Sequence, residues 1–218
     1  IFLAGEAPGL FYGYVTQGIV QKEDITENGI KYIKQDGSVG YYQTVNKTTP
    51  VAGDVKYVDR NGDGVVDDND RDIIGNPNPD FTYGFQTKVS WKSLSLSASF
   101  NGVQGRDILN VGNRYNNTPG TKSNNVTRKA FQNMWTDENP SNLYPKSTFV
   151  VQNMVMDRYV EDGSYLRCSD ITLSYVLPAK WTNKIGIKNT SVYASVKNAF
   201  VITDYSGYDP EVNSFAFD

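Results

Sequence analysis

The sequence predicts an all-β protein with antiparallel strands, because of its composition and two patterns. The 218 residues include 15 Tyr, 10 Phe, 3 Trp and 19 Gly, which is typical of strands joined by turns. Four segments alternate apolar and polar residues with a period of two. Short turns and long polar stretches alternate between these segments. Together these observations favour antiparallel sheets over a helical fold.

The first two predicted strands cover residues 81–91 and 94–103, and only residues 92 and 93 separate them. So short a connection predicts a hairpin of antiparallel neighbours. On each strand the apolar side chains occupy alternate positions, so they share one face. These side chains are Tyr83, Phe85, Val89, Trp91, Leu94, Leu96, Ala98 and Phe100.

The third and fourth predicted strands cover residues 165–177 and 190–202, and Pro178 ends the third. Both again carry their apolar side chains at alternate positions. These are Ile171, Leu173, Tyr175 and Leu177 on one strand and Val192, Ala194, Val196, Phe200 and Ile202 on the other.

Two further elements have weaker patterns. Residues 10–20 alternate less regularly and form a candidate fifth strand. Between residues 122 and 135, four apolar residues recur at near-helical spacing, which predicts a short amphipathic helix. They are Val126, Ala130, Phe131 and Met134.

The lengths of the connections bear on the architecture. Residues 91–93 and 178–188 are short turns, whereas 21–80, 104–162 and the residues after 203 are long and polar. Short turns at one end and long loops at the other are typical of outer-membrane β-barrels. Four or five strands cannot close such a barrel, which needs at least about eight. A β-sandwich whose apolar faces meet in a core therefore remains an alternative.

Composition excludes several functions. The net charge of −3 makes a nucleic-acid partner improbable, and no apolar run is long enough for a membrane helix. Histidine is absent, which removes His-based triads and His-ligated metal sites. The lone Cys168 is expected to be a small residue on an inward strand face, and the carboxylates of Asp204, Asp209 and Glu211 to be solvated surface. We predict that the protein is not an enzyme.

Residues 59–70 have the spacing of a calcium-binding loop of the EF-hand kind. Such a loop needs oxygen ligands at positions 1, 3, 5, 9 and 12, a carbonyl at position 7 and glycine at position 6, here Gly64. Asp70 stands where an EF-hand has Glu, so we expect weak, structural binding of Ca²⁺. The candidate ligands are Asp59, Asn61, Asp63, Val65, Asp67 and Asp70.

A turn that caps itself through side-chain to backbone hydrogen bonds, without metal, is the alternative for this segment. Helices do not flank it in either case. Residues 55–58 are predicted to form a strand before the loop, and Pro77 and Pro79 follow it.

Residues 53–85, GDVKYVDRNGDGVVDDNDRDIIGNPNPDFTYGF, resemble a stretch of the SusC/RagA-like TonB-dependent outer-membrane transporters of Bacteroidetes. Further stretches similar to that family are residues 9–14, 18–19, 160–167, 171–178, 196–200 and 205–211. The resemblance covers most of the chain; residues 21–52 and 111–158 are the least similar.

The resemblance implies that residues 1–218 are the C-terminal part of a 22-stranded transmembrane β-barrel of the bacterial outer membrane. Residues 53–80 would then be a calcium-type extracellular loop, and the short turns would face the periplasm. The plug domain and the closing strand are expected to lie outside these residues. Implied partners are a SusD-like surface lipoprotein, TonB through the absent N-terminal part, an oligosaccharide or peptide ligand, and outer-membrane lipid.

The leading hypothesis is therefore active import of a glycan or peptide. The alternative is a soluble extracellular β-sandwich that binds carbohydrate or mediates adhesion and holds a structural calcium. A sandwich would bury Leu94, Leu96 and Phe100 against a second sheet, whereas a barrel wall would leave them exposed.

Overall fold

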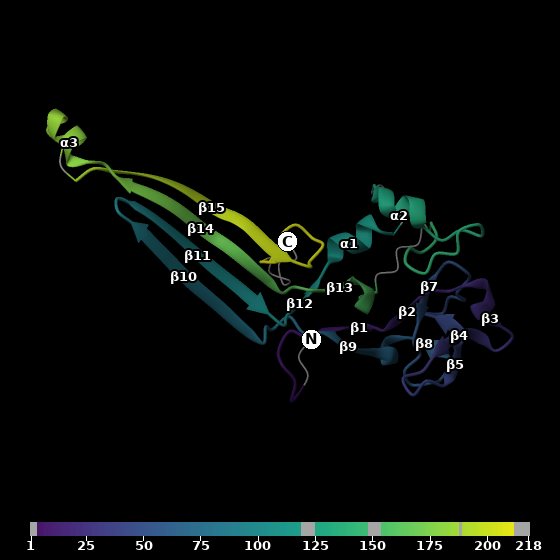
Figure 1. Cartoon of the computed structure of the whole chain (residues 1–218). Helices are drawn as coiled ribbons and strands as arrows, with labels where there is room; N and C mark the ends of the chain where they lie inside the picture. Colours follow the sequence, from purple (N-terminus) through teal and green to yellow (C-terminus); the bar gives the residue numbers. More distant parts are fainter. Residues whose placement is uncertain (1–3, 119–124, 148–153, 188, 212–218) are drawn as a thin grey trace. The chain divides into compact units, whose positions relative to one another are not determined.

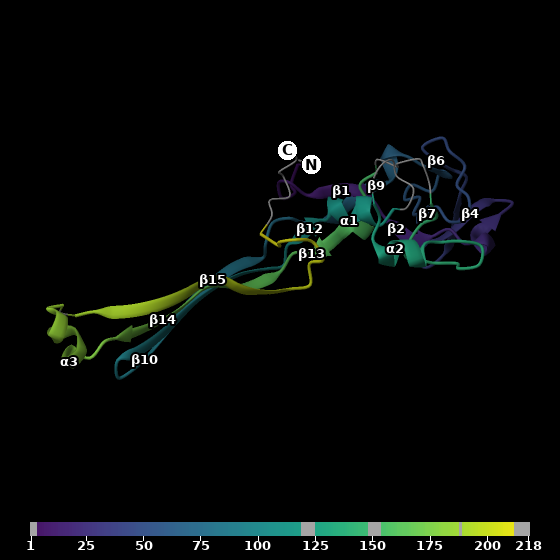
Figure 2. The same ribbon diagram turned by 90° about the horizontal axis from the view of Figure 1, so that it is seen from above.

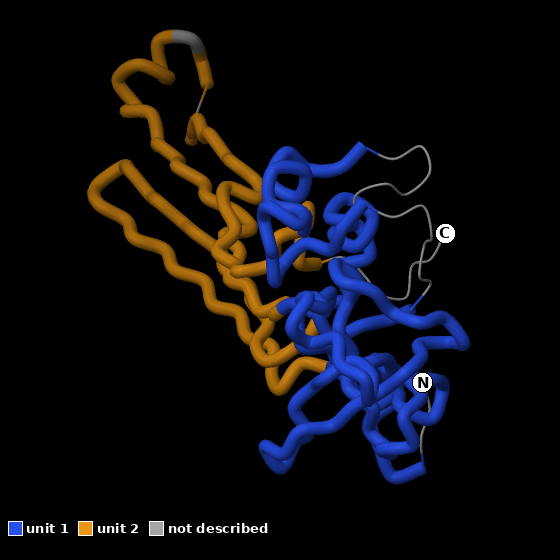
Figure 3. The backbone as a smooth tube through the Cα atoms, turned by 90° about the vertical axis from the view of Figure 1, so that its right-hand side faces the viewer, with its two compact units in different colours: residues 1–77, 108–161, 214–218 blue, residues 78–107, 162–213 orange. Residues whose placement is uncertain are grey.

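The structure is a computed structural model that describes residues 4–118, 125–147, 154–187 and 189–211. The chain divides into two compact units, coloured separately in Figure 3. Unit 1 comprises Ile1–Pro77, Ile108–Glu161 and Ser214–Asp218, and unit 2 comprises Asn78–Asp107 and Asp162–Asn213. The second stretch of unit 1 is thus inserted between two halves of unit 2.

Unit 2 is a four-stranded antiparallel sheet in the order β10-β11-β14-β15, drawn as the four long arrows of Figure 1. The strands are β10 (Phe81–Trp91), β11 (Leu94–Gln104), β14 (Tyr165–Val176) and β15 (Ser191–Thr203). All four predicted strands and the predicted hairpin are confirmed. The connection from β14 to β15 also contains α3 (Ala179–Thr182) and the 3-10 helix η4 (Asn183–Ile185), which the sequence analysis did not predict.

A β-bulge interrupts the alternation of β14. Ala98 pairs with Ile171, but Phe100, only two residues further, pairs with Cys168. The extra residue in β14 moves Cys168 to the same face as Phe100 and Phe200. The sequence predicts Cys168 on an inward strand face, whereas the bulge places it on the face that carries Phe100 and Phe200. Cys168 is fully buried and is a free thiol.

Unit 1 consists of short strands, several of which pair across long sequence separations (Figures 1 and 2). The antiparallel pairs join β1 (Phe11–Tyr14) to β9 (Arg71–Gly75) and β2 (Thr16–Ile19) to β7 (Val55–Tyr57). A three-stranded sheet contains β3 (Ile25–Thr26), β4 (Gly29–Ile33) and β5 (Val39–Tyr42). A parallel pair joins β6 (Thr44–Val45) to β8 (Val65–Val66), and β12 (Asp107–Leu109) pairs with β13 (Val160–Asp162).

Unit 1 has a hydrophobic core in which tyrosines are prominent. Tyr32, Tyr42 and Tyr57 are each buried to 1% exposure or less. The hydroxyl of Tyr32 donates to the carbonyl of Asp59 at 2.6 Å, and that of Tyr42 accepts from the amide of Tyr57 at 3.1 Å. Because these polar ends are bonded, burial of the rings is favourable. Residues 21–80 were expected to be a long polar loop, but residues 21–77 are part of this folded unit.

The candidate fifth strand at residues 10–20 is divided into β1 and β2, and it belongs to unit 1 instead of the four-stranded sheet. Its partners are β9 and β7, so the segment changes partner between the two strands, and burial does not alternate within either of them.

Short helices complete unit 1. They are α1 (Val111–Asn116) and α2 (Arg128–Asn133), with the 3-10 helices η1 (Lys22–Asp24), η2 (Asp68–Asp70) and η3 (Asp157–Tyr159). The predicted helix at 122–135 is present as α2, although residues 122–124 lie outside the described residues. Ala130 is buried, but Phe131 is exposed. None of the helices formed by the described residues is long and apolar enough to cross a membrane.

Candidate functional site

Most apolar side chains on one face of the unit 2 sheet are exposed to solvent, and most of the others are half-buried. The register aligns Val89 with Leu96, Leu96 with Leu173, and Ile171 with Val196, so these side chains form a continuous surface. Trp91 is 68% exposed, Ile202 62%, Val196 56% and Leu96 46%. We call this surface the apolar sheet face. It comprises Tyr83, Phe85, Val89, Trp91, Leu94, Leu96, Phe100, Leu173, Val192, Val196, Phe200 and Ile202.

Aromatic contacts run across the apolar sheet face. The rings of Phe85 and Phe100 stack at 4.6 Å between centroids, and Phe100 lies 6.4 Å from Phe200. A soluble domain seldom exposes so extended an apolar surface unless it contacts a partner or a membrane. The β-sandwich alternative required Leu94, Leu96 and Phe100 to be buried. Leu94 and Leu96 are exposed and Phe100 is half-buried, which counts against that alternative.

The opposite face of the sheet is mainly polar, although Tyr193 and Val201 are exposed there, and its polar side chains bond to one another across the strands. Ser90 and Ser95 share a hydrogen bond of 2.8 Å, and Gln86 donates to Ser99 at 3.0 Å. Thr172 and Ser195 both donate to the carboxylate of Asp170, each at 2.8 Å. The sheet therefore presents an apolar surface on one side and a hydrated one on the other.

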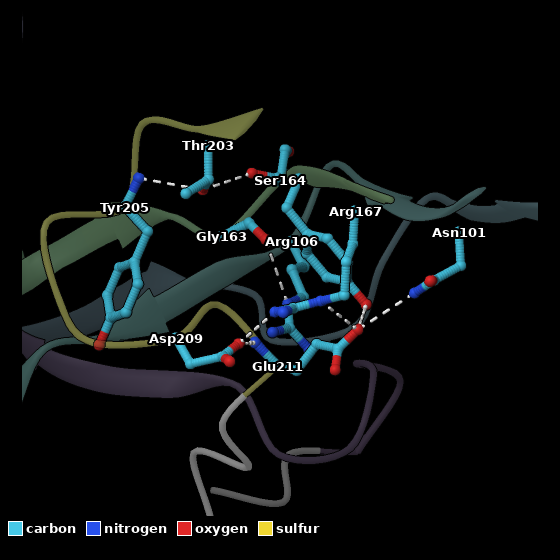
Figure 4. A network of polar contacts seen from close by, with 10 residues as sticks. Asn101, Arg106, Gly163, Ser164, Arg167, Thr203, Tyr205, Asp209 and Glu211 are labelled. Atoms are coloured by element: carbon cyan, nitrogen blue, oxygen red, sulfur yellow. Dashed lines mark hydrogen bonds and ion pairs between the residues drawn. The ribbon is translucent and has the colours of Figure 1, made fainter. Parts of the chain in front are cut away.

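At the end of the polar face away from the short turns, Arg167 binds two carboxylates (Figure 4). Its guanidinium lies 2.7 Å from Asp209 and 3.1 Å from Glu211. Tyr165 and Asn101 also donate to Glu211, at 2.9 and 3.1 Å. These bonds hold the segment that follows β15 against strands β11 and β14.

The two carboxylates in this network were expected to be solvated surface. Their side chains are indeed nearly half exposed, at 47% for Asp209 and 43% for Glu211, so each ion pair is modest in energy. The sequence pattern did not reveal their shared partner, Arg167, whose side chain is only 10% exposed. The one signal was an arginine between Leu166 and Cys168 near the start of β14.

The Asp-rich segment caps itself through its own backbone amides. The carboxylate of Asp59 accepts from Gly62 at 2.6 Å and from Gly64 at 2.8 Å, and both glycines have positive φ. Asp70 accepts from the amides of Arg60 at 2.8 Å, Asn61 at 3.3 Å and Asp67 at 2.8 Å. The bonds are those of the self-capping alternative.

The predicted calcium ligands are thus close in sequence, but they differ in burial and bond to different partners. Asp59 and Asp70 are buried, whereas Asp63 and Asn61 are exposed and bond to each other at 3.1 Å. Asp67 accepts from Asn69 at 2.8 Å, and Val65 lies in β8. Among the described residues, no group of three or more His, Cys, Asp or Glu side chains is arranged to hold a metal ion. Calcium binding therefore stays a prediction, and it requires these side chains to move together.

A cavity of about 170 Å³ lies in unit 1 beside β1, and Tyr14, Asp68 and Arg71 contribute to its lining. These groups bind one another: Tyr14 donates to Asp68 at 3.0 Å, and Arg71 pairs with Asp68 and lies over the Tyr14 ring. The charges in the cavity are therefore already balanced by each other.

The core tyrosines have raised pKa values. Burial, with the nearby charges of Asp59 and Asp70, raises the pKa of Tyr32 to about 12. Burial also raises the pKa of Tyr42 and of Tyr57. A raised pKa in the folded state means that folding favours the neutral phenol, so this contribution to stability is complete below the unfolded value of 10.

We therefore expect unit 1 to lose stability as the pH rises from about 10 to about 12. Tyrosinate absorbance and near-ultraviolet circular dichroism, followed together in an alkaline titration, would measure this. Replacement of the exposed Tyr41 by Phe should leave the midpoint unchanged. Tyrosinate formation in one step near pH 10, with no loss of tertiary signal, would contradict the expectation.

Comparison with known proteins gives relatives of one kind. No family model matches the chain. TonB-dependent receptor P3 of Formosa agariphila is 33% identical over 214 residues, which cover 98% of this chain and 19% of that protein. TonB-dependent receptor SusC of Bacteroides thetaiotaomicron is 34% identical over 165 residues, covering 72% of this chain and 15% of the receptor.

Solved structures agree with these relatives. The RagAB peptide importer in its open-open state matches 92% of this chain with a TM-score of 0.62 and 25% identity, and the match covers 19% of the solved chain. Our chain thus spans about a fifth of the length of the first relative and of this solved chain. Sequence relatives and the arrangement of strands lead to one conclusion: the chain belongs to the SusC/RagA-like TonB-dependent receptors.

Proposed function

We propose that this chain forms part of the wall of an outer-membrane transporter that imports a glycan or a peptide. The observation that carries the proposal is the apolar sheet face, largely exposed on a sheet whose other face is mainly polar. A transmembrane barrel requires that arrangement, because its outer side contacts lipid and its inner side lines a wet lumen.

The rest of the proposed barrel lies beyond this chain. Within the four-stranded sheet, β10 and β15 each have one neighbouring strand. Their free edges would pair with further strands of a 22-stranded barrel, of which residues 1–218 are the C-terminal part. Residues 53–80 would lie in its extracellular region. Closure would satisfy the edge amides and carbonyls, which lipid cannot hydrogen-bond.

The proposed transporter works with two partners. A SusD-like surface lipoprotein would cover the extracellular side and capture the ligand, and TonB would supply energy through the N-terminal part of the complete receptor. The pairing is supported by the names of the relatives, which include SusC and the RagAB peptide importer. Those names denote receptors and importers, and we expect no enzymatic activity.

Uptake by cells tests the proposal. A host lacking its own related receptors would express the complete receptor with its lipoprotein and receive labelled oligosaccharides in one series and labelled peptides in another. We expect TonB-dependent uptake of either the oligosaccharides or the peptides. Accumulation that persists without TonB, or binding without uptake in both series, would contradict it.

We further propose that the Asp-rich loop binds Ca²⁺ as a structural ion. Its support is the donor set, since Asp59, Asp63, Asp67 and Asp70 supply oxygen ligands at calcium-loop spacing. Millimolar calcium is expected to raise the melting temperature of the receptor relative to a chelator, and Asp63→Asn should abolish the increase. An unchanged melting temperature would mean that the backbone amides alone neutralise these carboxylates.

A further inference from the structure

The short turns of unit 2 lie together at one end of the sheet and carry positive charge. We call this region, residues 91–93, 177–187 and 189–190, the turn end. Lys92 lies in the first connection and Lys180 and Lys184 lie in the second, and all three are exposed. The two connections adjoin, because the amide of Val176 donates to the carbonyl of Ser93 at 2.8 Å. Neither connection contains Asp or Glu.

This charge is not balanced by neighbouring side chains. Residues 81–106 and 171–203 contain no acidic residue, although the whole chain has a net charge of −3. The acidic residues that flank the strands lie at the opposite end of the sheet. Asp162 precedes β14, and Asp204 and Asp209 follow β15. Within the described part of the chain, the ion pairs involve none of the three turn-end lysines.

Two tryptophans accompany the lysines. Trp91 and Trp181 are 68% and 63% exposed, and the Lys92 ammonium lies 4.7 Å from the centroid of the Trp91 ring. Tryptophan is favoured at the level of lipid headgroups, because its ring is apolar and its N–H is polar. A lysine beside it can lay its methylene chain on apolar surface while its ammonium reaches the phosphates.

We propose that the turn end binds the phosphate groups of anionic phospholipids, with Lys92, Lys180 and Lys184 as the contacting cations. Trp91 and Trp181 hold this end at headgroup depth. The inference rests on the proposed function, because it requires the apolar sheet face to lie in a bilayer. Charge complementarity selects anionic over zwitterionic lipid, and the exposed tryptophans favour a lipid surface over an acidic protein.

The test uses the complete receptor in vesicles that contain either spin-labelled phosphatidylglycerol or spin-labelled phosphatidylcholine. Electron paramagnetic resonance gives the fraction of each lipid immobilised on the protein. One variant carries Lys92→Gln, Lys180→Gln and Lys184→Gln together. The matched control carries Lys31→Gln, Lys34→Gln and Lys47→Gln, three exposed lysines of unit 1 with the same change in charge.

The wild type is expected to prefer phosphatidylglycerol, and the preference should fall as salt is added. Each ammonium near an anionic surface contributes about fivefold, so the turn-end variant should lose about a hundredfold in relative affinity. The control variant should retain the preference, as should a variant with arginine at the same three turn-end positions. An unchanged preference in the turn-end variant, or none in the wild type, would overturn the proposal.

A second measurement separates this proposal from the proposed function. Phospholipids with brominated acyl chains quench tryptophan that lies against lipid, and the difference between wild type and Trp91→Phe isolates the contribution of Trp91. Quenching without headgroup preference would overturn the lipid-binding inference alone. Absence of quenching would overturn both.

Discussion

Replacing Val196 by arginine is expected to destabilise the receptor in a bilayer by about 2–4 kcal/mol if the position lies near the bilayer midplane. Val196 is 56% exposed on the apolar sheet face and pairs with Ile171. In lipid, the guanidinium would lose its hydration with no acceptor nearby. Urea unfolding of the complete receptor in lipid vesicles, followed by tryptophan fluorescence, would measure the change in free energy.

The adjacent residue provides a control at matched depth. Ser195 lies on the polar face of the same strand and bonds to Asp170, so arginine at that position would find water and a carboxylate. We expect Ser195→Arg to change the free energy of unfolding by less than about 0.5 kcal/mol, as is usual at a hydrated surface. If Val196→Arg changes the free energy of unfolding as little as Ser195→Arg does, the apolar sheet face does not lie in lipid.

Replacing Asp70 by alanine is expected to destabilise unit 1 by about 3–5 kcal/mol. The Asp70 side chain is fully buried and accepts from three backbone amides, those of Arg60, Asn61 and Asp67. Alanine would leave these donors without their acceptor, and each would incur part of its desolvation free energy. Hydrogen exchange of the amides in residues 59–70 would report the local loss of protection.

Two comparisons test the cause of that loss. Asp63 is exposed and accepts from the amide of Val65 at 2.9 Å, so Asp63→Ala should cost less than about 1 kcal/mol. Asp70→Asn keeps one acceptor oxygen. We expect its loss of stability to lie between the losses caused by Asp63→Ala and Asp70→Ala. Equal effects of Asp63→Ala and Asp70→Ala would show that buried amide acceptance does not stabilise the loop.

Much of unit 2 could be predicted from sequence because its strands obey a local rule. Alternation at Leu94, Leu96 and Phe100 identifies a strand and a shared face without reference to any other residue. The rule fails at Cys168, where the bulge adds a residue to β14. The register shifts there against both neighbouring strands, so the bulge involves three segments that are far apart in the sequence.

Unit 1 and the Arg167 network show a different limit. Residues 21–80 have few regular apolar repeats, so they resemble a loop until tyrosines from separate strands, such as Tyr32 and Tyr57, meet in one core. Arg167 acquires its role only when Asp209 and Glu211, about 40 residues later, return to the sheet. Contacts between distant residues depend on the folded chain and leave no periodic pattern.

By itself the sequence determined the strands, the hairpin, the polar and apolar faces and the glycine-bearing Asp-rich turn, because each depends on residues close together in the chain. It could not determine whether the apolar faces are buried or exposed, since the same alternation of apolar and polar residues occurs in strands of a sandwich and of a membrane barrel. Only the tertiary structure decided this, by leaving Leu96 and Val196 exposed on a single sheet. The physical reason is that exposure depends on which surfaces the rest of the fold covers.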